Sequence, residues 1–263
     1  MTPFDFHVHT VFGDGRDTPE EIVKEAISKN MKRIGFSEHS DPLGSYLEMN
    51  EEKRAAYIRE IKDLKEKYKG KIEILLGIED DLFAPEYDNS ELDYVIGSVH
   101  YIEANGRLYA VDVSAEETAA IVEKEFGGDY LSYAEAYYEA LARLKDKKRV
   151  DIIGHFDLLM KFKDRGIFID EKSERYKNAY KRALDALGNG YIYEINTGAM
   201  SRGYRKEPYP SKEILTEIAK RGYRVIFSSD AHEKGNLTYA FSDLEELSSE
   251  LSLTVCDSPL CKI

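Results

Sequence analysis

The chain has 263 residues, of which 42% are hydrophobic and 33% are charged. These proportions are typical of a folded globular protein, and the length suits one large α/β domain or two small ones. The net charge of −13 opposes binding to nucleic acid, because proteins that bind nucleic acids normally present a basic face. No apolar run reaches the roughly 18 residues of a membrane span, so we expect no membrane partner.

The two ends of the chain predict a cytoplasmic protein. The segment from Thr2 to Val8 is strand-like and leaves no room for a signal peptide. The two cysteines, Cys256 and Cys261, are so close in sequence that a disulfide between them would close only a short loop. We therefore expect reduced thiols and a cytoplasmic location.

Strand-like and helix-like segments alternate along the chain. The segments that read as strands are residues 3–8, 33–37, 72–78, 93–99, 151–154, 191–196 and 223–229. Helix starts are indicated at Thr18, Ser114 and Ser242, because each has an acidic residue three positions later. Residues 51–69 place apolar side chains at helical spacing, and a helix is also expected after residue 240.

Histidines and acidic residues follow the predicted strands. The six histidines of the chain are His7, His9, His39, His100, His155 and His232. Glu79, Glu194 and Asp230 occupy similar positions. The C-terminal strand ends of a βα barrel surround one mouth, whereas those of an open sheet spread along an edge. Convergence of so many candidate ligands therefore favours a barrel with a multinuclear metal site, in a single domain over residues 1–263.

Two motifs have the spacing of metal-ligand pairs. Residues i and i+2 of a strand point to the same side. His7 and His9 can therefore bind one ion, and Asp230 and His232 repeat this arrangement from the last strand. Imidazole combined with carboxylate is compatible with zinc, iron or manganese.

The order of the motifs resembles that of the polymerase-and-histidinol-phosphatase (PHP) superfamily. The matching segments, between Phe4 and His232, are HVHT with GDG, SEH, GIE, GSVH, GHFD and SDAH. The resemblance implies an α/β fold, a distorted seven-stranded (β/α)7 barrel. It also implies two or three divalent metal ions at the C-terminal mouth of that barrel.

The resemblance further implies a set of ligands for three ions. They are His7, His9, Glu79 and Asp230 at the first ion, Glu79, His100 and His155 at the second, and Asp14, His39 and His232 at the third. Asp14 could instead simply form a turn, and Asp17 is the other candidate for its place. Asp80 and Asp81 are the alternatives to Glu79.

The expected chemistry is hydrolysis of a phosphomonoester. A water that bridges two divalent ions loses a proton near neutral pH and attacks phosphorus, while the ions stabilise the phosphoryl charge. We expect Glu79, Asp230 and His232 to take part in catalysis. The proton for the leaving alkoxide would come from Asp230 or from a water bound to a metal ion.

Two further segments resemble those of histidinol-phosphate phosphatases. GHFDLLMKF retains the family's lysine as Lys161, which is a candidate for binding the substrate, and EINTGAMSRGYRKEPYPS resembles the loop that supplies an arginine to the phosphate. Arg202 is the first candidate for that contact and Arg205 the second, because arginine donates paired hydrogen bonds to phosphate. A surface ion pair is the alternative for Arg205. Asp157 and Ser98 are candidates for hydrogen bonds to the metal-binding imidazoles.

The leading hypothesis is a cytoplasmic, metal-dependent histidinol-phosphatase of histidine biosynthesis, acting on a small phosphomonoester. Asp14 replaces a histidine that is common near this position in the histidinol-phosphatase branch. The rival hypothesis is therefore an enzyme of the same barrel that acts on a nucleotide or sugar phosphate. A non-catalytic metal-binding module is the third hypothesis, and the complete set of ligands argues against it. The sequence makes no prediction of the oligomeric state.

Overall fold

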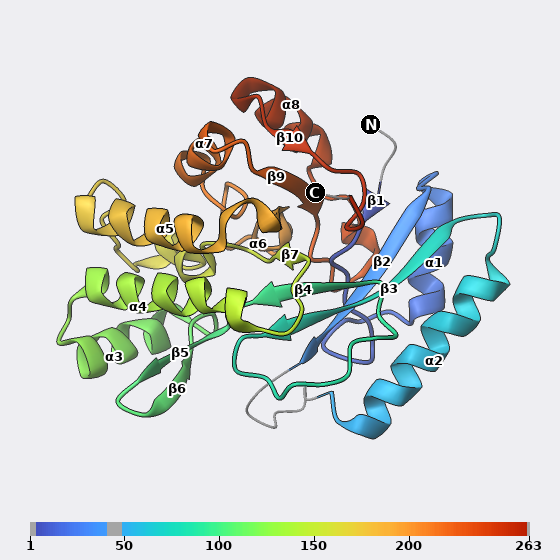
Figure 1. The fold of residues 1–263 in the computed structure, drawn as a ribbon, viewed down its shortest axis with the longest axis horizontal. Coiled ribbons are helices and arrows are strands. Elements are labelled where there is room, and N and C mark those ends of the chain that lie inside the picture. Colours follow the sequence, from blue (N-terminus) through green and yellow to red (C-terminus); the bar gives the residue numbers. More distant parts are fainter. Residues whose placement is uncertain (1–3, 41–48, 262–263) are drawn as a thin grey trace.

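The computed structural model describes residues 4–40 and 49–261. Its central feature is a curled sheet of eight parallel strands with helices packed along it (Figure 1). In sheet order the strands are β1 (Phe4–Asp5), β2 (Arg33–Ser40), β3 (Glu73–Asp81), β4 (Tyr94–Ser98), β7 (Ile152–Ile153), β8 (Ile192–Asn196), β9 (Arg224–Ser228) and β10 (Thr254–Val255). A separate antiparallel hairpin consists of β5 (Tyr101–Ala104) and β6 (Arg107–Ala110).

The curled sheet closes through a short contact between β1 and β9. Val8, just beyond β1, forms a parallel bridge with Ala231, just beyond β9. The amide of His9 donates to Ala231 O at 2.9 Å, and the amide of Ala231 donates to His7 O at 3.2 Å. The predicted barrel of seven strands is therefore confirmed. The eighth strand, β10, was not predicted, and it pairs with the first residues of β9, away from this contact.

Two predicted strands are shorter than expected. Of residues 3–8, only Phe4–Asp5 pairs regularly, and Pro3 lies outside the described residues. Of residues 151–154, only Ile152–Ile153 does so. Beyond these strands, side chains replace some of the ladder acceptors: Val8 N donates to Ser37 Oγ at 3.1 Å, and His155 N donates to Glu194 Oε2 at 2.8 Å. The backbone that carries these histidines is thus held by side-chain hydrogen bonds as well as by backbone ones.

The helices confirm most of the predicted helix starts. They are α1 (Pro19–Ser28), α2 (Glu51–Lys67), α3 (Ala115–Phe126), α4 (Tyr130–Ala142), α5 (Glu174–Leu187), α6 (Gly198–Ser201), α7 (Lys212–Lys220) and α8 (Phe241–Leu251). Thr18 forms the predicted capping box with Glu21, and Ser114 caps α3. The predicted cap at Ser242 is wrong, because α8 begins at Phe241 and its N-cap is Ala240, two residues earlier, in a left-handed conformation (φ 55°). No helix of the described ranges is long and apolar enough to span a membrane.

Tyr94 fills the interior of the barrel. Its side chain is fully buried, and its hydroxyl donates to Phe6 O at 2.6 Å and to Phe36 O at 3.0 Å. Gly35 and Gly77 make room for it, because a Cβ atom at either position would overlap the Tyr94 side chain. One phenol therefore ties β4 to the backbone of the first two strands.

A layer of tyrosines lies between α4 and α5, which run side by side in Figure 1. Tyr138, Tyr176 and Tyr180 are buried there with their rings in contact. Tyr133 and Tyr137 of α4 are also buried, the first against Phe126 and the second near His155 O. The hydroxyl groups of Tyr138 and Tyr176 lie 2.9 Å apart, so they satisfy each other inside the apolar layer. Tyr138 also packs against Phe156, directly beside the candidate ligand His155. This layer supports one wall of the site.

We expect Tyr94→Phe to lower the free energy of unfolding by about 1–3 kcal/mol. The substitution removes a buried donor and leaves two buried carbonyl oxygens without that partner. Urea denaturation measures the loss, with Tyr239→Phe as the matched control because Tyr239 is 41% exposed. Equal and small losses in the two variants would contradict the proposed tie across the barrel.

Candidate metal centre

The predicted metal ligands meet at the C-terminal mouth of the barrel. A cavity of about 260 Å³ is lined there by Asp14, His39, Glu79, His100, His155, Asp230 and His232. The remaining two candidates, His7 and His9, are fully buried and contact these residues from beneath. The expectation that distant segments of the chain converge on one site is therefore confirmed.

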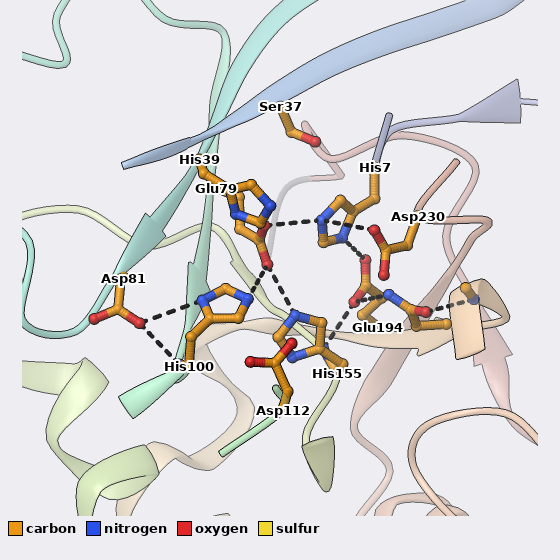
Figure 2. A network of polar contacts seen from close by, with 12 residues as sticks. His7, Ser37, His39, Glu79, Asp81, His100, Asp112, His155, Glu194 and Asp230 are labelled. Atoms are coloured by element: carbon orange, nitrogen blue, oxygen red, sulfur yellow. Dashed lines mark hydrogen bonds and ion pairs between the residues drawn. The ribbon is translucent and has the colours of Figure 1, made fainter. Parts of the chain in front are cut away.

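Glu79 is the central carboxylate of the site (Figure 2). Its Oε1 lies 2.9 Å from His155 Nε2 and 3.3 Å from His100 Nε2. Its Oε2 lies 2.8 Å from His39 Nδ1 and 3.3 Å from His7 Nε2. Burial alone would raise the pKa of Glu79, but the imidazoles lower it well below the ordinary value, so the group is a carboxylate.

The neighbours of Glu79 make other contacts. Asp80 pairs with Lys147 Nζ at 2.8 Å and accepts a hydrogen bond from Ser40 Oγ at 2.5 Å. Asp81 accepts hydrogen bonds from the backbone amide of His100 at 2.8 Å and from that of Phe83 at 2.8 Å. Of the three acids, Glu79 has the position that suits a bridging ligand.

The ligand atoms form three overlapping groups, each compact enough to hold one ion. The groups are His7, His9 and Asp230; His39, Glu79 and His100; and His9, Asp14, His39 and His232. Within each group the ligand atoms lie within 4.8 Å of one another. The groups resemble the three predicted sets, with three differences. Glu79 is absent from the first group, His39 takes the place expected for His155 in the second, and His9 adjoins the third.

The donor atoms themselves fit a metal. His7 Nε2, His9 Nδ1, Asp14 Oδ1 and Glu79 Oε2 are buried without a hydrogen bond of acceptable geometry in the described part of the chain. A buried polar atom without a partner costs about 1–3 kcal/mol. Coordination of a divalent cation by these nitrogen and oxygen atoms would offset that cost.

Asp14, and not Asp17, belongs to the third group. Asp14 Oδ2 lies 3.1 Å from His232 Nε2, and Asp14 Oδ1 lies 3.6 Å from His39 Nε2. Burial alone would raise the pKa of Asp14, but these imidazoles lower it below the ordinary value. Asp17 instead pairs with the side chain of Lys234 at 2.9 Å.

The buried histidines differ in charge. Burial lowers the pKa of His9 to about 3, and repulsion from His39 and His232 adds to this effect. His9 is therefore neutral, as a ligand must be. Burial also acts to lower the pKa of His7, but Glu194 and the other nearby carboxylates raise it well above the ordinary value. Because metal binding competes with protons, ions would displace that proton from His7.

Glu194 fixes two candidate ligands from behind, a role that the sequence analysis did not assign. Its Oε1 accepts from His7 Nδ1 at 2.5 Å, and its Oε2 accepts from the amide of His155 at 2.8 Å. Ser228 Oγ and Asn196 Nδ2 donate to the same carboxylate at 2.6 and 3.0 Å. The available signal was the spacing of Glu194 and Asn196, which places both on one face of β8.

The two predicted supports for the imidazoles are wrong. Ser98 Oγ is buried without a hydrogen-bond partner among the described residues. Asp157 accepts from Arg205 Nη1 at 3.4 Å, because the loop after β8 brings that arginine over it. The ring of His100 is supported instead by Asp81, whose Oδ2 lies 3.3 Å from Nδ1.

Arg202 and Lys161, two of the three cations predicted to bind the substrate, face the cavity. Arg202 donates to Asp230 Oδ2 at 3.1 Å and contacts His232 Nδ1 at 2.8 Å. Burial alone would raise the pKa of Asp230, but Arg202 and the nearby imidazoles hold it well below the ordinary value. Lys161 Nζ lies 3.0 Å from Oδ2 of Asp112, which also lines the cavity.

Arg205 lies elsewhere. Its side chain is buried, its guanidinium stands 4.4 Å from the centre of the Tyr209 ring, and it pairs with Asp157 and Glu207. It does not line the cavity. The structure therefore places this arginine as a support of the loop after β8. The predicted alternative, a surface pair, is also wrong because the pair is internal.

A parallel barrel whose mouth gathers imidazoles and carboxylates for several ions defines a metal-dependent hydrolase fold. Comparison with known proteins names the group: residues 5–198 match the PHP domain, and the chain belongs to this family. A probable histidinol-phosphatase of Deinococcus radiodurans is 31% identical over 91% of this chain and 90% of its own length. A histidinol-phosphatase of Bacillus subtilis is 26% identical over 92% and 97%.

Solved structures show the same fold. A putative histidinol phosphatase from Listeria monocytogenes has a TM-score of 0.78 at 22% identity, covering 91% of this chain and 99% of that one. The histidinol phosphate phosphatase of Lactococcus lactis, complexed with zinc, L-histidinol and phosphate, has a TM-score of 0.69 at 21% identity. That likeness covers 97% of this chain and 95% of the other.

We expect Glu194→Gln to weaken metal binding by about 10–100-fold, the usual cost of losing a group that orients a metal ligand. Glutamine keeps the shape but removes one of the two carboxylate acceptors that hold His7 and the His155 segment. Titration with zinc or manganese, followed by calorimetry, measures the change. Glu139→Gln, an exposed position on α4, is the control. Unchanged affinity in the Glu194 variant would refute this role.

Proposed function

We propose that this chain hydrolyses L-histidinol phosphate to L-histidinol and phosphate, a step of histidine biosynthesis. The observation that carries the proposal is the complete set of imidazole and carboxylate ligands around Glu79, with Arg202 and Lys161 facing the same cavity. Relatives that match about nine-tenths of the chain and bear the name histidinol-phosphatase support the choice of substrate.

The proposal includes two or three divalent ions, drawn from zinc, iron and manganese. Three compact groups of ligand atoms support this number, and the zinc in the Lactococcus lactis structure supports the kind of ion. Such ions, when bound, would activate water for attack and stabilise negative charge on the phosphoryl oxygens. Glu79, Asp230 and His232 would hold them.

The residues of the chain orient the substrate. Arg202 is held by Asp230 on one side of the cavity. This pairing fixes the orientation of the guanidinium group, and with it the direction of the remaining N–H donors. Lys161 supplies a second cation that lines the cavity. A cavity of about 260 Å³ suits a small phosphomonoester. Asp14, whose presence motivated the nucleotide or sugar phosphate alternative, lies in the third group with His9, His39 and His232, which supports its role as a ligand.

The cytoplasmic location is part of the same proposal. Cys256 and Cys261 are both free thiols, which is the usual state in a reducing compartment.

We expect purified protein loaded with manganese or zinc to release phosphate from L-histidinol phosphate far faster than from AMP or a sugar phosphate. A chelator should stop the reaction, and Glu79→Gln should nearly abolish it because the central carboxylate is lost. Circular dichroism of the variant checks that the fold is intact. Faster turnover of AMP or the sugar phosphate would overturn the proposed substrate, and normal turnover by Glu79→Gln would remove Glu79 from its central role.

Substitution of the two arginines in the loop after β8 should have different effects. Arg202→Ala should raise KM by about tenfold or more, since hydrogen bonds to charged groups contribute about 1.5–3 kcal/mol. Arg205→Ala should instead lower thermal stability, because it leaves the buried Asp157 unpaired. Steady-state kinetics and thermal unfolding measure both effects, with the exposed Arg59→Ala as control. A larger KM effect in the Arg205 variant would reverse this assignment.

A further inference from the structure

One carboxylate at the cavity is left without a role by the metal groups. The acidic residues that line the cavity are Asp14, Glu79, Asp81, Asp112 and Asp230. Three of them belong to the ligand groups. Asp81 is 1% exposed, and both of its oxygens accept backbone hydrogen bonds. Asp112 remains, and 28% of its side chain is exposed.

Asp112 is held in a fixed orientation. The hairpin that precedes it is pinned at its base, where Val111 N donates to His100 O at 2.9 Å. Lys161 Nζ donates hydrogen bonds to two atoms of Asp112, the carbonyl oxygen at 2.8 Å and Oδ2 at 3.0 Å. Its other oxygen, Oδ1, has no hydrogen-bond partner in the described ranges. One edge of the carboxylate is thus engaged and the other is available to a ligand in the cavity.

The position of Asp112 relative to the metal groups is also defined. Figure 2 shows it next to the imidazoles of His100 and His155, and it interacts electrostatically with both. It belongs to none of the three compact groups of ligand atoms. Asp112 therefore stands at the border of the metal centre, within reach of whatever is attached to a phosphoryl group bound there.

The chemistry of the proposed substrate supplies a partner for this oxygen. In L-histidinol phosphate the ammonium group is carried by the carbon adjacent to the ester carbon. A phosphate held at the ligand groups therefore brings that ammonium close to the border of the centre. A cation taken from water into a cavity needs a paired anion, because an unpaired buried charge is strongly unfavourable.

We propose that Asp112 is a specificity-determining residue that binds the ammonium group of the substrate through Oδ1. This inference rests on the proposed function and identifies the residue that recognises the ammonium group of the substrate. Lys161 is then a positioning residue for Asp112 as well as a cation near the phosphate. Sugar phosphates and nucleoside monophosphates carry no ammonium at that carbon, so Asp112 would face a neutral or anionic group and select against them.

The test compares L-histidinol phosphate with its deamino analogue, imidazolylpropyl phosphate, in wild-type protein and in Asp112→Asn. Asparagine keeps the size of the side chain and removes its charge. For L-histidinol phosphate the variant should raise KM by about 10–100-fold, the range expected for a hydrogen bond to a charged group. For the deamino analogue, KM should not rise. Glu103→Gln, which removes one charge from the same hairpin, should leave both substrates unaffected.

Two further measurements separate the explanations. Lys161→Met should raise KM for both substrates, because it removes a cation near the phosphate. An equal rise of KM for both substrates in Asp112→Asn would show that Asp112 only positions Lys161, and would overturn the inference. Loss of bound manganese or zinc in Asp112→Asn would assign Asp112 to the metal centre and would also overturn it. If wild-type protein fails on L-histidinol phosphate but hydrolyses AMP, the proposed function itself is the part that fails.

Discussion

The compensation of one buried carboxylate by surrounding imidazoles is the interaction on which the site depends. Glu79 is 1% exposed, and isolation of its charge from water would be strongly unfavourable. Imidazoles that follow or end β1, β2, β4 and β7 surround its two oxygens and offset that cost. The barrel makes this possible, because only a closed arrangement of parallel strands brings these segments to one point. Fold and chemistry are therefore coupled at a single side chain.

Around this centre the polar groups are arranged in successive layers. Glu194 holds His7 and the amide of His155, and it is itself held by two donors on β8 and β9. Beneath, Tyr94 ties three strands together at the barrel interior. Buried ionic groups are tolerated when their hydrogen bonds are satisfied. The atoms left without such bonds include several that are directed at the candidate ions, and also His155 Nδ1 and Ser98 Oγ.

The sequence predicted the barrel and the convergence of the ligands because strand ends and histidine motifs are local patterns. It ranked Arg202 above Arg205 but kept both as candidates, since both lie in one loop and only the tertiary fold decides which of them faces the cavity. Asp112 was missed for a similar reason, because it follows a hairpin and no ligand motif. The strand β10 was missed because two residues carry no periodic pattern. Asp157 was predicted to support an imidazole, whereas its side chain pairs with Arg205 from a loop distant in sequence.

The closure of the barrel has a consequence for cooperativity. Val8 and Ala231 form the only bridge between β1 and β9 in the described structure, and each lies between two candidate ligands. Because His7, His9 and Asp230 form one ligand group, an ion bound there joins both sides of this seam. The free energy of opening the barrel at this point then depends on ion concentration. The rates of amide hydrogen exchange at His9 and Ala231 would therefore depend on ion occupancy. The bound metal would stabilise the closed barrel in addition to its part in catalysis.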